Sequence, residues 1–243
     1  YGIDSNLTPD IVDNFTKQGA TNLKASEETG LNVGVPITYR AGDQPNNALA
    51  LNVFDNGEVA ASGGTSGVIY SITNNINSNE PSRINHFAHV NYSDDNRSVG
   101  KLLCINGAGI QYRWLRNHSI GKSYEKMNEA ASNIAVGSEG ISVIPFGNGA
   151  ERMLNNKNIG THICNINLNQ HSHGHLYRSS LEGIAFSFMY GMEILKNDDA
   201  LIKRHSFPSS THACNKVIVP ITFVSIVSAG FVNETSGLLC AAK

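Results

Sequence analysis

Segments with two different hydrophobic periods alternate along this chain of 243 residues, and that alternation constrains the fold more than any other feature. Glu58–Ala61 and Gly67–Ile72 are short apolar runs of strand type, and Ser62–Ser66 between them has the composition of a hairpin turn. Residues 175–196 carry apolar side chains at spacings near multiples of 3.6, which predicts a long helix. Because strands and helices alternate, we expect an α/β fold.

The other apolar segments continue the alternation. Short runs with strand character are residues 36–39, 86–91, 101–105, 140–145 and 162–168. Segments with helical character begin near Lys24 and cover residues 46–53, 107–116 and 123–133.

Charge and hydropathy exclude several classes of partner. The 18 Lys and Arg residues against 20 Asp and Glu give a net charge of -2, so the basic surface needed for nonspecific nucleic-acid binding is missing and we expect no nucleic-acid partner. The most apolar stretch, residues 217–232, is interrupted by polar residues and is shorter than the roughly 20 residues of a membrane-spanning helix. We therefore expect no membrane partner.

Cysteine usage and the first residues bear on the compartment. The four cysteines, at positions 104, 164, 214 and 240, are widely spaced among apolar neighbours, which favours buried thiols over a disulfide framework. The opening residues carry no visible signal peptide. We expect a cytoplasmic location, and because residue 1 is Tyr and not Met, we expect a piece of a longer protein.

Composition divides the chain unevenly. Residues 1–30 are polar and lack a sustained period, so we expect an interdomain linker and the start of a domain that covers residues 31–243. Within that domain, residues 197–243 form an atypical tail, rich first in Ser, His and Pro and then in β-branched residues typical of a strand.

Asp43 is the first candidate for chemistry. It follows Gly42 directly after a predicted strand, where a turn can hold a carboxylate over the edge of a sheet at which α/β proteins bind ligands. The alternative is that Asp43 caps a helix starting at Pro45, since Asp is a favoured cap and Pro is common just inside a helix.

Two glycine-rich turns are the other candidates. Gly63–Gly67 can direct backbone N–H groups and two hydroxyls at a phosphate, or can be a simple hairpin. Asn106–Gly109 enters a helix with Gln111 in its first turn, which suits a nucleotide but also an ordinary strand-to-helix connection. The His and Cys spacings match no standard zinc pattern, so we expect no metal ligated by these side chains.

The residues of these segments and their order along the chain resemble the carboxyl-terminal half of the FGGY carbohydrate kinases. The resemblance covers about residues 30–196 and is most specific at Gly42–Gln44 and His175–Glu182. It also includes residues 145–152, which read Pro-Phe-Gly-Asn-Gly-Ala-Glu-Arg. It implies an actin-like ATPase fold of the ribonuclease H-like type, a mixed sheet flanked by helices, and transfer of the ATP γ-phosphoryl group to a sugar hydroxyl. The likeness is strongest to members that phosphorylate pentuloses, D-xylulose above all.

The resemblance also implies roles for particular residues. Asp43 matches the catalytic base and Gln44 a neighbour on the sugar side. The residues matching the ATP-binding positions are Gly64, Thr65, Ser66, Gly107 and Gln111. The resemblance implies that ATP with Mg²⁺ and a sugar are the ligands. It also implies that an amino-terminal sugar-binding domain is absent from this chain. A homodimer is possible.

Two departures from the family pattern leave alternatives for the function and for the acceptor. Thr161 and Asn165 stand where the family usually has small residues, and residues 205–232 replace a Gly-rich turn and a helix that hold adenosine. A noncatalytic or degenerate kinase domain that only binds a nucleotide or a partner domain is the alternative function. Ribulose, rhamnulose, gluconate and glycerol are the alternative acceptors.

Overall fold

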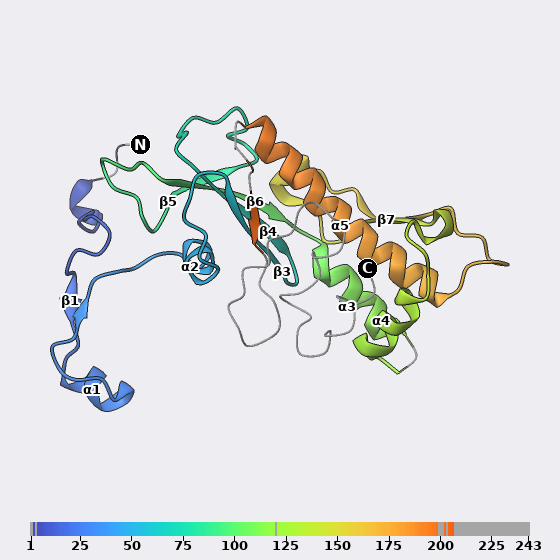
Figure 1. Ribbon diagram of the computed structural model, residues 1–243, viewed down its shortest axis with the longest axis horizontal. Coiled ribbons are helices and arrows are strands. Elements are labelled where there is room, and N and C mark those ends of the chain that lie inside the picture. Colours follow the sequence, from blue (N-terminus) through green and yellow to red (C-terminus); the bar gives the residue numbers. More distant parts are fainter. Residues whose placement is uncertain (1, 3, 120, 199–201, 203, 207–243) are drawn as a thin grey trace.

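The computed structural model describes residues 2, 4–119, 121–198, 202 and 204–206 (Figure 1). The α-helices are α1 (Leu23–Thr29), α2 (Asp43–Ala50), α3 (Ala108–His118), α4 (Tyr124–Ser132) and α5 (His173–Asn197). The strands are β1 (Gly19–Ala20), β2 (Pro36–Ile37), β3 (Glu58–Gly63), β4 (Gly67–Thr73), β5 (Asn85–Ala88), β6 (Val99–Ile105), β7 (Ser142–Phe146), β8 (Gly160–Cys164) and β9 (Arg204–Ser206). Short 3-10 turns are η1 (Ser5–Leu7), η2 (Ser138–Gly140) and η3 (Glu151–Leu154).

A five-stranded mixed sheet is the centre of the domain. Its strand order is β5-β6-β4-β3-β9, with β9 parallel to β3 and every other neighbouring pair antiparallel. The β3–β4 hairpin closes at the pair Gly63 and Gly67, so the connection is the three residues Gly64–Ser66. The expected α/β fold with a mixed sheet flanked by helices is confirmed.

Helices cover both faces of this sheet. On one face, α2 and the loop after it bring Ala48 and Val53 into a core with Tyr70 and Leu102. On the other face, Ile69 and Leu103 join a larger core that includes Phe188 of α5. Alternate residues of each strand thus enter different cores, as the period of 2 in a strand requires.

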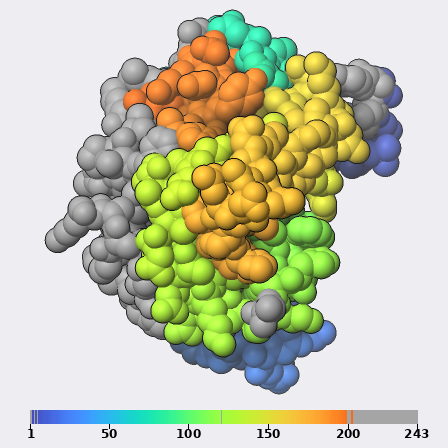
Figure 2. Space-filling model, turned by 90° about the vertical axis from the view of Figure 1, so that its right-hand side faces the viewer, coloured from blue at the N-terminus to red at the C-terminus, as the bar shows by residue number. Residues whose placement is uncertain are grey.

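Helix α5 approaches its neighbours closely at glycines. A Cβ on Gly183 would lie 2.2 Å from the carbonyl oxygen of Val143 in β7, and one on Gly191 would lie 2.9 Å from the side chain of Ile69. Figure 2 shows α5 in orange between the green helical region and the yellow β7–β8 region. Because α5 touches both sheets, it determines how the β7–β8 pair is placed against the main sheet.

The motif at the start of α5 has a structural role. Ser172 and His175 form a reciprocal capping box, in which the Ser172 N–H donates to His175 Nδ1 at 3.0 Å. About two turns further along α5, Glu182 accepts from the Gly137 N–H at 3.0 Å and from the Ser138 hydroxyl at 2.9 Å. These contacts hold the turn before β7, where Ser138 has a positive φ of 49°.

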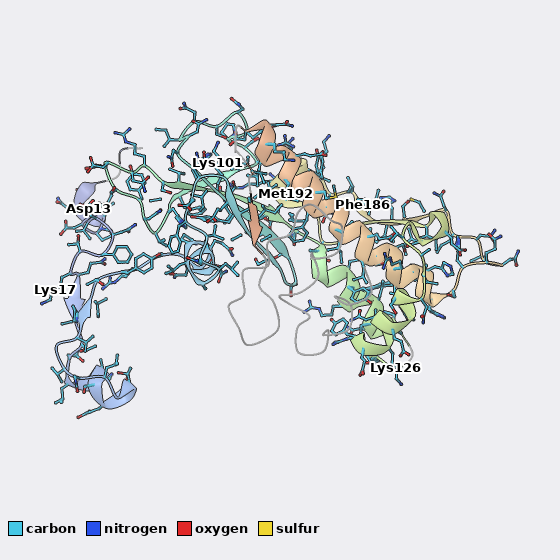
Figure 3. The ribbon with its side chains drawn as sticks, viewed as in Figure 1. Asp13, Lys17, Lys101, Lys126, Phe186 and Met192 are labelled. Carbon is cyan, nitrogen blue, oxygen red and sulfur yellow. The ribbon has the colours of Figure 1, made fainter. Side chains whose placement is uncertain are left out.

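A buried ion pair joins the end of α5 to β6. Lys101 Nζ lies 2.8 Å from Asp198 Oδ2, and both side chains are fully buried (Lys101 is labelled in Figure 3). Asp198 also accepts from the Ser78 hydroxyl and the Glu80 N–H, while Lys101 donates to the Asn77 carbonyl. Burial alone would raise the pKa of Asp198, but these hydrogen bonds, that from Lys101 foremost, hold it below its ordinary value of 3.8.

Residues 4–40 form an arm that extends away from the sheet (Figure 1). Helix α1 buries none of its residues, and Ile11 and Phe15 are 98% and 58% exposed. Asn14 attaches the arm by donating to the carbonyls of His89 and Val90 at 3.0 and 2.9 Å. An isolated two-stranded sheet such as β1–β2 is marginal in water, so the arm gains little stability from its own sheet.

Most expected elements are present with shifted ends. The runs predicted at 58–61, 67–72 and 101–105 are strands, and the predicted helices at 107–116, 123–133 and 175–196 are α3, α4 and α5. The strand expected at 36–39 is shorter, because β2 ends at Ile37, and the helix expected from 46 begins at Asp43. The strand expected in the tail lies outside the described residues.

We expect Asp198→Asn to lower the free energy of unfolding by about 3 to 5 kcal/mol at pH 7, because it leaves the buried Lys101 ammonium without a counter-charge. Since the folded pKa of Asp198 lies below 3.8, its contribution is present at neutral pH and is lost as the pH falls below about 4. Urea unfolding at pH 7, 5 and 3.5 measures both effects.

The exposed pair Lys24 and Glu28 supplies the control, because its side chains are 82% and 66% exposed. Glu28→Gln should change stability by less than about 1 kcal/mol. Equal unfolding free energies for Asp198→Asn and the parent at pH 7 would show that the buried pair has no net stabilising effect.

Candidate functional site

The β3–β4 hairpin and the first turn of α3 are joined by backbone hydrogen bonds. The Gly109 N–H donates to the Gly64 carbonyl and the Ile110 N–H donates to the Thr65 carbonyl, both at 3.0 Å. Two turns that lie more than 40 residues apart in the sequence, both expected to contact a nucleotide, therefore form one unit.

This arrangement changes which groups are available to an anion. The amides of Gly109 and Ile110, which a helix N-terminus would otherwise offer to a phosphate, are taken by the hairpin. In the hairpin, the Gly64 N–H donates to the Ser66 carbonyl at 2.8 Å. Thr65 and Ser66 are exposed, and among the described residues their hydroxyls have no hydrogen-bond partner. The loop therefore offers two free hydroxyls, while two amides of the helix end are occupied.

Gly107 brings a third turn to the same place. Its φ of 89° is in the left-handed region, and a Cβ there would lie 2.3 Å from the Pro145 carbonyl oxygen, so a side chain at this position would clash. Next to it, Asn106 Nδ2 donates to the Asn148 carbonyl at 3.1 Å. The turn after β7 is thereby held against the turn after β6.

Asp43 and Gln44 are the first two residues of α2. The N-cap is Gly42, without a side-chain cap, so the alternative reading of Asp43 as the cap of a helix starting at Pro45 is wrong. Asp43 also does not follow a strand directly, because β2, which pairs with β1, ends at Ile37. Both carboxylate oxygens of the exposed Asp43 accept from Gln44, from its N–H at 3.0 Å and its Nε2 at 3.2 Å.

A cavity of about 210 Å³ lies between α2 and β3. It extends from Gln44 to Ser62, the residue before the hairpin pair Gly63–Gly67. Its lining residues are Gln44, Asn47, Ala50, Leu51, Ala60, Ala61 and Ser62. The cavity therefore connects the helix that carries Asp43 with the strand that leads into the loop.

Charged residues gather around Cys104 on the same face of the sheet. Cys104 pairs with Val68, which pairs with Ser62, so these three side chains form one row at the end of the strands. Burial raises the pKa of the Cys104 thiol, and the nearby carboxylates of Glu151 and Asp43 raise it further against the opposing effect of Arg152. Asp43 and the turn after β7 thus lie within electrostatic range of one thiol.

Sequence reasoning did not identify Ser62, Cys104 or Arg152 as neighbours of this site. Arg152 is exposed and donates a hydrogen bond to Asn85 Oδ1. For Cys104 the available signal was the alternation along β6, which predicts that it lies on the same face as Leu102.

Gln111, in contrast, is nearly buried, with 5% of its surface exposed. Its Oε1 accepts a hydrogen bond from the Thr161 hydroxyl of β8 at 2.8 Å. Its Nε2 is buried and has no partner within the described part of the chain. Gln111 lies on the turn of α3 that holds the hairpin, but its side chain is buried and hydrogen-bonded to β8.

Two further observations concern metals and membranes. Among the described residues, no group of three or more His, Cys, Asp or Glu side chains is placed to hold a metal ion, and Cys104 and Cys164 are free thiols. In the same part of the chain, no helix combines the length and apolar character needed to cross a bilayer.

Known proteins match this chain in sequence. Residues 59–219, more than half of the chain, match the C-terminal domain of the FGGY family of carbohydrate kinases. A xylulose kinase of Haemophilus influenzae is 24% identical over 190 residues, which cover 78% of this chain and 37% of that protein. A gluconokinase of Bacillus subtilis is 24% identical over 196 residues, covering 74% of this chain and 37% of that protein. The chain thus spans little more than a third of the length of these relatives.

Solved structures match the fold. A xylulose kinase from Rhodospirillum rubrum superposes with a TM-score of 0.72 at 22% identity, covering 84% of this chain and 41% of that one. Plasmodium falciparum glycerol kinase, solved with ADP, gives a TM-score of 0.67 at 18% identity, covering 80% and 38%. The mixed sheet with helices on both faces is the actin-like ATPase fold of these kinases. On the match of residues 59–219, this chain belongs to the FGGY family of carbohydrate kinases.

Proposed function

We propose that this chain is the nucleotide-side domain of a cytoplasmic kinase that transfers the ATP γ-phosphoryl group to a pentulose, D-xylulose above all, giving D-xylulose 5-phosphate. Xylulose kinases and gluconokinases are both among its relatives at 22 to 24% identity, so the kinase class is better supported than the acceptor. Gluconate, ribulose, rhamnulose and glycerol are the other acceptors that the family allows.

The observation that carries the proposal is the cavity between α2 and β3. It runs from Gln44, the neighbour of the expected base, to Ser62, two residues before the expected phosphate loop. Phosphoryl transfer requires this relation, because the acceptor hydroxyl and the γ-phosphate must meet in line next to a group that accepts the proton.

The loop residues fit an anionic nucleotide. Thr65 and Ser66 offer hydroxyls, exposed and without protein partners among the described residues, on a turn whose carbonyls are already occupied by α3. Turns of small residues can present such hydrogen-bond donors to phosphate oxygens. Mg²⁺ would enter with the nucleotide, held by phosphate oxygens and water, and would neutralise phosphate charge.

In the proposed reaction Asp43 accepts the proton of the sugar hydroxyl. The hydroxyl oxygen forms the new bond to the γ-phosphorus while the bond from phosphorus to the β–γ bridging oxygen breaks, and ADP leaves with that electron pair. Gln44 holds the Asp43 carboxylate by hydrogen bonds to both oxygens, so the base needs little reorganisation before it acts.

The exposed arm of residues 4–40 is evidence for a second domain as partner. Its apolar side chains Leu7, Ile11 and Phe15 are exposed, and the chain covers only 37% of the relatives it matches. We propose that the arm packs on the amino-terminal sugar-binding domain of the complete protein. The family match begins at residue 59, so the domain start near residue 31 stays a prediction.

In the complete gene product, Asp43→Asn should lower kcat by about 10² to 10⁴ and leave nucleotide affinity nearly unchanged, because the amide keeps the shape but cannot accept the proton. Steady-state kinetics and calorimetry with MgATP measure the two effects. Asp94→Asn, at another exposed aspartate, is the control and should keep the parent rate. Turnover of Asp43→Asn within a few-fold of the parent contradicts the role of Asp43 as base.

Thr65→Val should weaken ATP binding by about 1.5 to 3 kcal/mol, the usual effect of losing a hydrogen bond to a charged group. Its melting temperature should stay near that of the parent, since the backbone carbonyl that holds Ile110 remains. Thr65→Ser keeps the hydroxyl and should bind ATP like the parent. Equal ATP affinities with a lowered melting temperature for Thr65→Val would make the loop purely structural.

The 243-residue chain alone should not phosphorylate D-xylulose. The chain contains Asp43 but not the second domain proposed to hold the acceptor. In a cleft between two domains, closure is needed to align the reacting atoms. ADP release with saturating MgATP and D-xylulose, compared with the complete gene product, tests this. Comparable sugar-dependent turnover would mean that this chain contains a complete active site.

A further inference from the structure

The β7–β8 pair supplies a hydroxyl to the first turn of α3. Thr161 lies opposite Pro145 in the β7–β8 register, and its hydroxyl donates to Gln111 Oε1 at 2.8 Å. Among the described residues, this is the hydrogen bond that the Gln111 side chain makes. A carboxamide has one acceptor oxygen and one NH₂ donor, so a contact to the oxygen determines where the donor points.

The position of the Thr161 hydroxyl is itself restricted. A Cβ on Gly147 would lie 2.6 Å from Thr161 Oγ1, so the chain just after β7 passes close to this oxygen. The absence of a side chain at Gly147 is what leaves room for Thr161. Thr161 therefore reaches Gln111 from a sheet that α5 holds in place at Gly183.

The side-chain NH₂ group of Gln111 is a donor that lacks an acceptor among the described residues. Gln111 Nε2 is buried, with 95% of the residue's surface covered, and has no acceptor within the described residues. A buried donor without an acceptor is unfavourable, so this position favours binding of a group that supplies an acceptor. Gln111 is one residue beyond Ile110, whose N–H holds the Thr65 carbonyl of the expected phosphate loop.

We propose that Thr161 is a positioning residue for nucleotide binding: it orients the Gln111 carboxamide so that Nε2 donates to a hydrogen-bond acceptor of the bound nucleotide. The proposal rests on the proposed nucleotide site and adds to it a residue outside the glycine-rich turns. Thr161 acts through Gln111 and does not touch the reacting atoms.

The test is a double-mutant cycle in the complete gene product, with MgADP affinity measured by calorimetry. Thr161→Val, which keeps the shape and removes the hydroxyl, should weaken MgADP binding about five- to tenfold, the usual effect of one lost hydrogen bond. Thr161→Ser should restore binding. In a Gln111→Leu background, Thr161→Val should cause no further loss. Ser142→Ala, at an exposed hydroxyl on the same two-stranded sheet, is the control.

A second readout separates positioning from stability. The side-chain amide NMR signals of Gln111, assigned by their loss in Gln111→Leu, should shift when MgADP binds to the parent and should shift less in Thr161→Val. Melting temperatures establish that each variant is folded, and Thr161→Ala replaces Thr161→Val should the latter not fold.

Three outcomes would overturn the proposal. They are unchanged affinity in Thr161→Val, a loss that persists in the Gln111→Leu background, and Gln111 amide signals that do not respond to MgADP. In all three the parent still binds the nucleotide. A parent that does not bind MgADP would refute the proposed function itself, together with this role of Thr161.

Discussion

The close contact of α5 with two sheets is the constraint on which the rest of the domain depends. Gly183 allows the helix to approach the backbone of β7, and Gly191 allows it to approach Ile69 and Leu103 of the main sheet. Protein interiors are close-packed, so a helix held this tightly on both sides leaves little freedom between them. The turns after β6 and β7 can meet at Gly107 because α5 has already placed their strands.

In the resulting site, the hairpin occupies two amides at the start of α3 and leaves its own hydroxyls free. Carbonyls of the hairpin satisfy the first free amides of α3, which is a general requirement at helix N-termini. That contact rigidifies the hairpin and directs its carbonyls away from an incoming anion. The exposed hydroxyls of Thr65 and Ser66 are then what the loop can present to a ligand.

Charge is distributed differently in the interior and at the site. Lys101 and Asp198 are fully buried and paired, which ties the end of α5 to the sheet. Asp43, Glu151 and Arg152 are exposed around the half-buried Cys104. The buried pair contributes to specifying the fold, whereas exposed charges keep the hydration and mobility that a group needs to meet a substrate.

Local sequence pattern was sufficient to predict several elements of the fold and the family. The apolar periods predicted the β3–β4 hairpin, β6 and α5, because the hydrophobic period of a segment depends on that segment alone. The motifs around Gly42–Gln44 and His175–Glu182 indicated the family, which the match over residues 59–219 bears out.

What only the tertiary structure decided were contacts between distant parts of the chain. The capping of α3 by the hairpin and the pairing of Thr161 with Gln111 join residues whose local sequence carries no sign of the partner. Lys101 and Asp198 lie 97 residues apart in the chain, and nothing near either predicts the other. Hydrogen bonds and ion pairs depend on atomic distances of about 3 Å, and packing of the whole domain sets those distances.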